Sequence, residues 1–98
     1  MYLKSELSNL RCTFLVDCGA DISIIKAEKI KATQIYYPTE TCQILGIGTG
    51  TISSIGSTNT HVNINDVFLE QTFQIVNNDF PIPTDGILGR DFFIMHYF

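Results

Sequence analysis

The chain has 98 residues, of which 45% are hydrophobic, and ten acidic against six basic side chains give it a net charge of -4. This length fits one domain with a single core, small enough that a partner chain would add stability. The acidic balance, without a continuous basic patch, argues against nucleic-acid binding. No apolar run approaches the roughly 20 residues that cross a bilayer, so no membrane association is expected.

The cysteines and histidines indicate neither disulfides nor a metal. Cys12, Cys18 and Cys42 are odd in number, lack metal-ligand spacing and come without a signal peptide. We therefore expect free thiols and a reducing, intracellular setting, most simply the cytoplasm. His61 and His96 have no second ligand nearby, which predicts surface or packing histidines. No metal and no cofactor are expected.

Short strands separated by turn residues predict a mostly β domain. Residues 2–7 and 10–16 flank Ser8-Asn9, which predicts a hairpin. Residues 22–25 predict another strand, and residues 26–30 predict at most one helical turn. The lysines between positions 26 and 31 are interpreted as a solvated face.

The middle of the chain is rich in glycine. Residues 44–56 have apolar and hydroxyl residues on both arms and glycines at the centre, which predicts a β-hairpin with a mobile tip near residues 48–50. Two interpretations stay open at this point. The hairpin is either an ordinary exposed turn or a flap that closes over a ligand.

The second half predicts a long hairpin, a loop and a helix. Residues 60–64 alternate in polarity, Asn65-Asp66 turn, and a strand follows over residues 67–76 with Phe73 and Ile75 on one face. Pro81 and Pro83 favour an extended loop. Ile87 and Leu88 then re-enter the core. A terminal helix follows, with an apolar side that we expect to cover the core, formed by Phe92, Phe93, Met95 and His96.

Two motifs stand at strand ends. Asp17 follows the apolar residues Leu15 and Val16, and Gly19 lets the backbone turn directly after it. This arrangement displays a single carboxylate at the end of a buried strand. Residues 84–93 form the second motif, in which an apolar strand stops at Gly89 and a helix begins.

Together these motifs resemble the retropepsins, the aspartic proteases of retroviruses and gypsy-type retrotransposons. That family carries an Asp-Thr/Ser-Gly-Ala-Asp block and a later Ile-Leu-Gly-Arg-Asp/Asn block, and the resemblance extends from Tyr2 to Phe98. It implies a closed β barrel with a flap hairpin and one short C-terminal helix. The flap would lie at residues 44–56, and its substrate-binding tip would comprise Gly46, Ile47, Gly48, Thr49 and Gly50.

The resemblance implies an endopeptidase whose catalytic residue is Asp17. Peptide hydrolysis by this route needs two carboxylates around one water, whereas the chain has one such motif. A symmetric homodimer would supply the second. Two carboxylates about 3 Å apart share a proton, which predicts activity at acidic pH. The substrate would be extended polypeptide held by Gly19 and Ala20, and the natural task would be processing of a Gag-Pol-like polyprotein within a retroelement particle.

The resemblance also implies a brace for the catalytic loop. Arg90 would pair with Asp21 in a bidentate contact, with Gly89 and Asp91 beside it. The alternative is two solvated charges, worth under about 1 kcal/mol. Cys18 stands where the family has Thr or Ser, and because a thiol is a poor hydrogen-bond donor we expect a weaker grip between subunits.

The chain ends depart from the family pattern as well. Members commonly build a dimer sheet from strands at both ends, yet the first predicted hairpin begins at Tyr2 and the sequence stops at Phe98, so we expect these strands to be short or missing. A piece of a longer polyprotein, a gene-model fragment and a domesticated copy all fit. Two other functions therefore stay open: a catalytically inactive, peptide-binding or dimerising module of the same fold, and a small β-barrel binding protein in which Asp17 is a structural turn residue.

Overall fold

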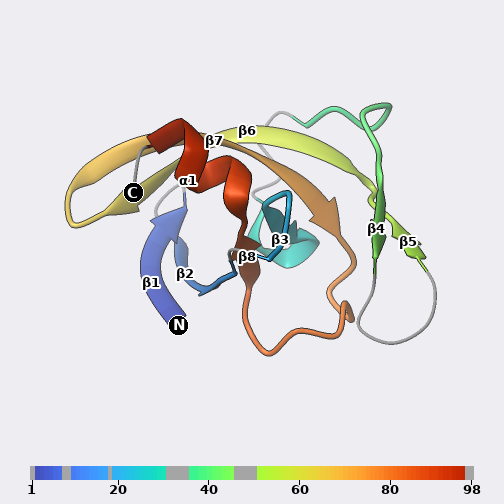
Figure 1. Ribbon diagram of the computed structural model, residues 1–98, viewed down its shortest axis with the longest axis horizontal. Coiled ribbons are helices and arrows are strands. Elements are labelled where there is room, and N and C mark those ends of the chain that lie inside the picture. Colours follow the sequence, from blue (N-terminus) through green and yellow to red (C-terminus); the bar gives the residue numbers. More distant parts are fainter. Residues whose placement is uncertain (1, 8–9, 18, 31–35, 46–50, 97–98) are drawn as a thin grey trace.

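Six strands close into a barrel in the computed structural model, which describes residues 2–7, 10–17, 19–30, 36–45 and 51–96 (Figure 1). The order around the barrel is β1 (Tyr2–Leu7), β2 (Leu10–Val16), β8 (Gly86–Leu88), β3 (Ile24–Lys26), β7 (Val67–Val76) and β6 (Gly56–Ile64). A separate two-stranded sheet, β4 (Gln43–Leu45) and β5 (Thr51–Ser53), lies at the opposite end of the molecule from β1 in Figure 1. The 3-10 helix η1 (Ala27–Lys29) and the helix α1 (Arg90–His96) complete the fold, so the predicted mostly β, closed-barrel architecture is confirmed.

Two hairpins join consecutive strands of the barrel. β1 and β2 pair antiparallel from Tyr2↔Leu15 to Leu7↔Leu10, which leaves two residues between the strands. β6 and β7 pair along their whole lengths and turn at Asn65 and Asp66, whose φ angles are 52° and 65°. A two-residue turn with both φ angles positive matches the right-handed twist of the strands, and Asn and Asp tolerate that backbone better than most residues. Both predicted hairpins are present.

The buried side chains of the core follow the alternation of inward and outward residues along each strand. Phe14 of β2 and Phe73 of β7 are fully buried, and their rings stack with centroids 5.6 Å apart. Ile75, two residues beyond Phe73, is buried on the same face, as predicted. A second cluster lies beside the first, formed by Ile24, Val76, Phe80 and Ile82.

The parallel pairing of β2 with β8 positions the site. Phe14 lies opposite Gly86 and Val16 lies opposite Leu88. A side chain at position 86 would run into the carbonyl oxygen of Ile24 and the Phe14 ring, so glycine is what lets β8 lie between β2 and β3. Because parallel strands end at the same edge, the residues after Val16 and after Leu88 meet there.

Lys26 and Lys29 do not lie on a solvated face, as the sequence analysis had interpreted them. Lys26 donates its Nζ to the carbonyl oxygen of Ile82 at 2.9 Å, and Lys29 Nζ lies 3.8 Å from Asp85 Oδ1. The interpretation is therefore wrong for Lys26 and Lys29, because their long side chains reach across to the loop that precedes β8. Lys31 lies outside the described residues.

The strand predicted over residues 22–25 and the helix also differ in detail. β3 begins at Ile24, because Ser23 is used in contacts with the start of α1. On α1, Phe92 is buried and the His96 ring lies 4.7 Å from the Phe92 ring, whereas Met95 is exposed. The prediction that Met95 covers the core is wrong, since its side chain is 63% exposed. No helix in the described part of the chain is long and apolar enough to span a bilayer.

The buried Cys12 thiol predicts a loss of stability at alkaline pH. Burial, and next the negative charge of Asp85, raise the pKa of Cys12 from 9.0 to about 11. The unfolded thiol ionises at the lower pKa, so its contribution is complete below pH 9.0 and is lost as the pH rises toward about 11. Urea unfolding across this pH range should show the free energy of unfolding falling more steeply in the wild type than in Cys12→Ala. Parallel curves for the two proteins would contradict this account.

Candidate active site

Asp17 lies directly after β2, and its backbone fixes it to the neighbouring strand. Its N–H donates to the carbonyl oxygen of Leu88 at 3.1 Å, which continues the parallel ladder one step beyond β2. The half-buried carboxylate of Asp17 accepts the Gly19 N–H at Oδ1 over 2.9 Å, and the Ala20 N–H donates to the Asp17 carbonyl oxygen at 3.1 Å. The turn therefore orients one carboxylate oxygen, and Oδ2 has no hydrogen-bond partner among the residues that the structure describes.

Gly19 stands close to this carboxylate. A Cβ atom at position 19 would lie 3.2 Å from Asp17 Oδ1, which is tighter than ordinary van der Waals contact. Any side chain there would press on the oxygen that the turn positions. Cys18, between the two residues, lies outside the described part of the chain.

A hydrogen-bond network around Asp91, in the first turn of α1, supports the loop. Asp91 Oδ1 accepts the Ser23 hydroxyl at 2.7 Å, and Oδ2 accepts the Ser23 N–H at 3.1 Å and the Gln71 side-chain amide at 3.1 Å. The Ser23 hydroxyl in turn accepts the Gly89 N–H at 3.0 Å. Ser23 and Gln71 are both buried, so this carboxylate joins the approach to β3, the strand β7 and the start of α1.

Gly89 allows the helix start to approach the loop that carries Asp17. A Cβ atom at position 89 would lie 2.6 Å from the Ile22 carbonyl oxygen and 2.8 Å from that of Ala20. With glycine there, the Arg90 N–H donates to the Ala20 carbonyl oxygen at 2.8 Å. The loop that carries Asp17 is thereby hydrogen-bonded to the start of α1.

The Arg90 side chain contributes less than expected. Its Nη2 lies 3.6 Å from Asp21 Oδ1, and the side chains of Arg90 and Asp21 are 59% and 82% exposed. This is one long contact rather than the bidentate pair we expected, because water competes for both exposed groups. The brace consists instead of the Arg90 backbone and the Asp91 carboxylate. Sequence analysis named Asp91 but missed its partners Ser23 and Gln71.

A hollow of about 540 Å³ opens beside the carboxylate. Asp17, Gly19, Ala20 and Asp21 form one wall, and the remaining wall is largely apolar. That wall brings together β3, β4, β8 and the proline-containing loop, through Ile22, Ile24, Ile44, Phe80, Ile82 and Ile87. Ligand sites of this kind commonly measure about 300–1,000 Å³ and combine apolar walls with a few polar groups.

The arms of the predicted flap form a hairpin. Ile44 of β4 pairs with Ile52 of β5, and the Ser54 N–H donates to the Cys42 carbonyl oxygen at 2.9 Å below them. Ile44 also lines the hollow, so β4 borders the site. The expected substrate-binding tip, residues 46–50, lies outside the described residues.

Among the described residues, no group of three or more His, Cys, Asp or Glu side chains could hold a metal ion. The His96 Nε2–H donates to the Glu70 carbonyl oxygen over 2.7 Å, and the His96 ring packs on Phe92. His61 is exposed on β6.

Comparison with known proteins agrees with this geometry. The model of the retroviral aspartyl protease family matches residues 2–95. A retrovirus-related Pol polyprotein from transposon 412 of Drosophila melanogaster is 39% identical over 85 residues, which cover 87% of this chain and 7% of that protein. The EIAV protease, solved with the inhibitor HBY-793, shares the fold with a TM-score of 0.65 and 21% identity, over 96% of this chain and 85% of that one. The chain belongs to the retroviral aspartyl protease family.

The hydrogen bonds of Asp91, rather than the exposed Arg90–Asp21 ion pair, should hold the loop after Asp17 in place. Two substitutions can distinguish these two contributions. Asp91→Ala leaves buried donors of Ser23 and Gln71 without their acceptor and should lower the free energy of unfolding by about 2–3 kcal/mol. Asp21→Ala, which removes an exposed partner of Arg90, should cost under about 1 kcal/mol. Urea denaturation of both variants measures the difference. Equal losses would show that the network does not carry the brace.

Proposed function

We propose that this chain is an aspartic endopeptidase that hydrolyses extended polypeptide, with Asp17 as its catalytic residue. The observation that carries the proposal is the Asp17 carboxylate at the wall of an apolar hollow, with one oxygen held by the Gly19 N–H and the other without a hydrogen-bond partner in the described ranges. Membership of the retroviral aspartyl protease family supports the same reaction.

The reaction requires a second carboxylate, which we assign to Asp17 of a second copy in a symmetric homodimer. One carboxylate accepts a proton from the attacking water, while the other, protonated, polarises the scissile carbonyl group. Two such groups about 3 Å apart hold one proton between them and titrate as a pair. Activity should therefore be highest at acidic pH, where the pair carries a single negative charge.

The catalytic loop and the hollow suggest how the substrate lies. The N–H groups of Gly19 and Ala20 are both used inside the turn, which leaves the carbonyl oxygen of the exposed Gly19 to accept an N–H of an extended peptide. The apolar wall would receive apolar side chains of the substrate. The residues 46–50 would close over the peptide as a flap.

The natural substrate is proposed from the Pol polyprotein relative. This chain spans about 7% of the length of that protein, as expected for one domain among several. A protease domain within a polyprotein would release itself and its neighbours by cleaving extended linkers. The setting would be an intracellular retroelement particle.

Cleavage of a mixed peptide library tests the proposal. At about pH 5, on the acid side expected for a shared-proton pair, the wild type should cleave peptides with apolar residues next to the cut. Asp17→Asn should lose cleavage entirely, because an amide can neither accept the proton from water nor share one with its partner. Product is measured by mass spectrometry at several protein concentrations, and the rate should rise more than linearly as dimers form.

A Glu40→Gln variant controls for the removal of a carboxylate elsewhere, since Glu40 is exposed and does not line the hollow. It should keep its activity. Cleavage that survives in Asp17→Asn would refute the assignment of Asp17. Absence of cleavage in the wild type, with monomers by sedimentation, would favour the inactive peptide-binding module of the same fold.

Cys18, although outside the described residues, yields a separate prediction about the dimer. Restoring the hydroxyl with Cys18→Thr should give a stronger hydrogen bond between the two catalytic loops and lower the dimer dissociation constant. Cys42→Thr is the matched control, because it makes the same exchange at the wall of the hollow. Analytical ultracentrifugation measures both constants. An unchanged constant in Cys18→Thr would count against this role for residue 18.

A further inference from the structure

The two arms of the β4–β5 hairpin are hydrogen-bonded to each other and to the barrel at their base, beside the hollow that contains Asp17. The Cys42 N–H donates to the Ser54 hydroxyl oxygen at 2.9 Å, and the Ser54 N–H donates to the Cys42 carbonyl oxygen at 2.9 Å. Ser54 is only 5% exposed. The Ile55 N–H then donates to the carbonyl oxygen of Ile75, in β7, at 2.8 Å. The hairpin is therefore attached to β7 where its arms end.

The arms also pack on the outer face of β7. Because side chains alternate along a strand, Gln74 and Val76 lie on the face opposite to Ile75, which belongs to the barrel core. Val76 is fully buried in the second cluster, and Ile44 of β4 and Ile52 of β5 pack against that cluster. Gln74, two residues before Val76, is half-buried. A polar side chain therefore lies on the face of β7 that the hairpin covers.

The side-chain amide of Gln74 contacts both arms. The carbonyl oxygens of Glu40 and Gly56 face the same end of this amide, and because a carbonyl oxygen only accepts hydrogen bonds, that end is assigned as the nitrogen. Nε2 then donates to the Ser54 hydroxyl oxygen at 2.7 Å and to the two carbonyl oxygens at 3.2 Å each. Glu40 precedes β4 and takes part in this contact through its backbone alone, whereas Ser54 and Gly56 follow β5. One side chain thus joins the entry and the exit of the hairpin.

The backbone of Gln74 contacts the support of the Asp17 loop. Its N–H donates to the Ser23 carbonyl oxygen at 3.0 Å. The Ser23 hydroxyl in turn donates to Asp91 and accepts the Gly89 N–H. Gln74 is therefore hydrogen-bonded through its side chain to the hairpin and through its backbone to the segment that braces the loop after Asp17.

We propose that Gln74 is a positioning residue, whose amide holds the β4–β5 hairpin at the edge of the hollow and thereby sets the affinity for an extended polypeptide. Ile44 of β4 lines the hollow, so a displaced hairpin would move a wall that contacts the ligand. The identity of this ligand rests on the proposed function, whereas the attachment of the hairpin does not. Replacing the side chain keeps the backbone bond to Ser23, so peptide binding rather than the chemical step should change.

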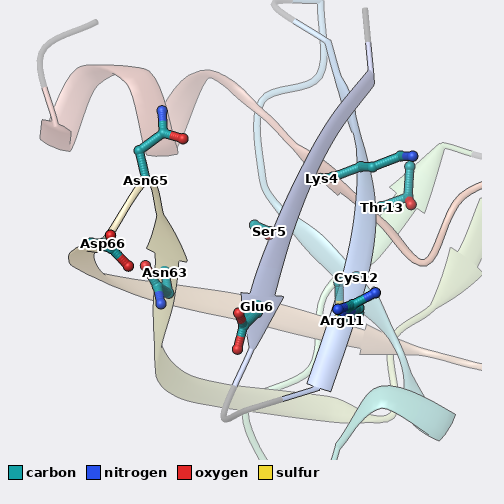
Figure 2. A pocket seen from close by; sticks show the side chains of 9 residues that line it. All are labelled: Lys4, Ser5, Glu6, Arg11, Cys12, Thr13, Asn63, Asn65 and Asp66. Atoms are coloured by element: carbon teal, nitrogen blue, oxygen red, sulfur yellow. The ribbon is translucent and has the colours of Figure 1, made fainter.

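Asn63 provides a matched control, because it carries a similar amide on β6 in another part of the barrel. It lines a separate hollow between β1 and the β6–β7 turn, whose lining also includes Glu6 and Asp66 (Figure 2). That hollow shares no lining residue with the hollow beside Asp17. Asn63 Oδ1 has no hydrogen-bond partner among the described residues. Removal of this amide should therefore leave the β4–β5 hairpin unaffected.

Amide hydrogen exchange tests the attachment without an assay of activity. Gln74→Met keeps the length of the side chain and removes both N–H donors. The amides of Cys42 and Ser54 should then exchange about tenfold faster than in the wild type, while amides within β1 and β2 keep their rates. Ser54→Ala, which removes the shared hydroxyl, should accelerate the Cys42 amide in the same way. Asn63→Leu should leave the Cys42 and Ser54 amides at wild-type rates.

Steady-state kinetics test the consequence for binding. On a peptide that the wild type cleaves, Gln74→Met should raise KM about tenfold and leave kcat within about twofold, because the Asp17 loop keeps its support. Asn63→Leu should change neither constant. A residue that only filled space would give wild-type values in Gln74→Met.

Unchanged exchange at Cys42 and Ser54 in Gln74→Met would overturn the attachment, and so would equal acceleration of amides throughout the barrel. Faster exchange at these two amides with an unchanged KM, or with a loss confined to kcat, would overturn the role in binding and leave the proposed protease function intact. A wild type that cleaves no peptide would refute the proposed function and, with it, the polypeptide as ligand, whereas the exchange rates would still decide whether Gln74 holds the hairpin.

Discussion

The carboxylate of Asp91 is the interaction on which the site depends. It accepts hydrogen bonds from Ser23 and Gln71, and the Ser23 hydroxyl accepts the Gly89 N–H. These contacts join the segments before β3, within β7 and at the start of α1, which no local interaction could hold together. Because the loop after Asp17 is hydrogen-bonded to this helix start, the position of the Asp17 carboxylate depends on a network that does not include Asp17 itself.

The same geometry explains why one chain presents a single carboxylate at the hollow. Parallel pairing of β2 with β8 brings the loop after Val16 to the edge where α1 begins, and the turn at Gly19 then directs a single carboxylate into the hollow. A symmetric partner can present the same carboxylate from the other side.

Local signals in the sequence predicted much of the fold. Asn65-Asp66 specifies the β6–β7 hairpin through turn chemistry, and the position of Asp17 directly after β2 was predicted from the apolar strand and the glycine around it. The brace was predicted only in part, because Ser23 and Asp91 are 68 positions apart and an ordinary serine carries no pattern that names a distant partner. Met95 was misplaced since an apolar residue on a short helix does not reveal which side faces the core.

The stoichiometry of a transition-state mimic tests the central claim, that two copies of Asp17 form one catalytic site. Calorimetric titration of the chain with a statine-containing peptide, whose hydroxyl takes the place of the attacking water between two carboxylates, counts the inhibitor molecules bound. The account predicts one inhibitor for every two chains and no binding by Asp17→Asn. One inhibitor per chain, or equal binding by Asp17→Asn, would contradict it.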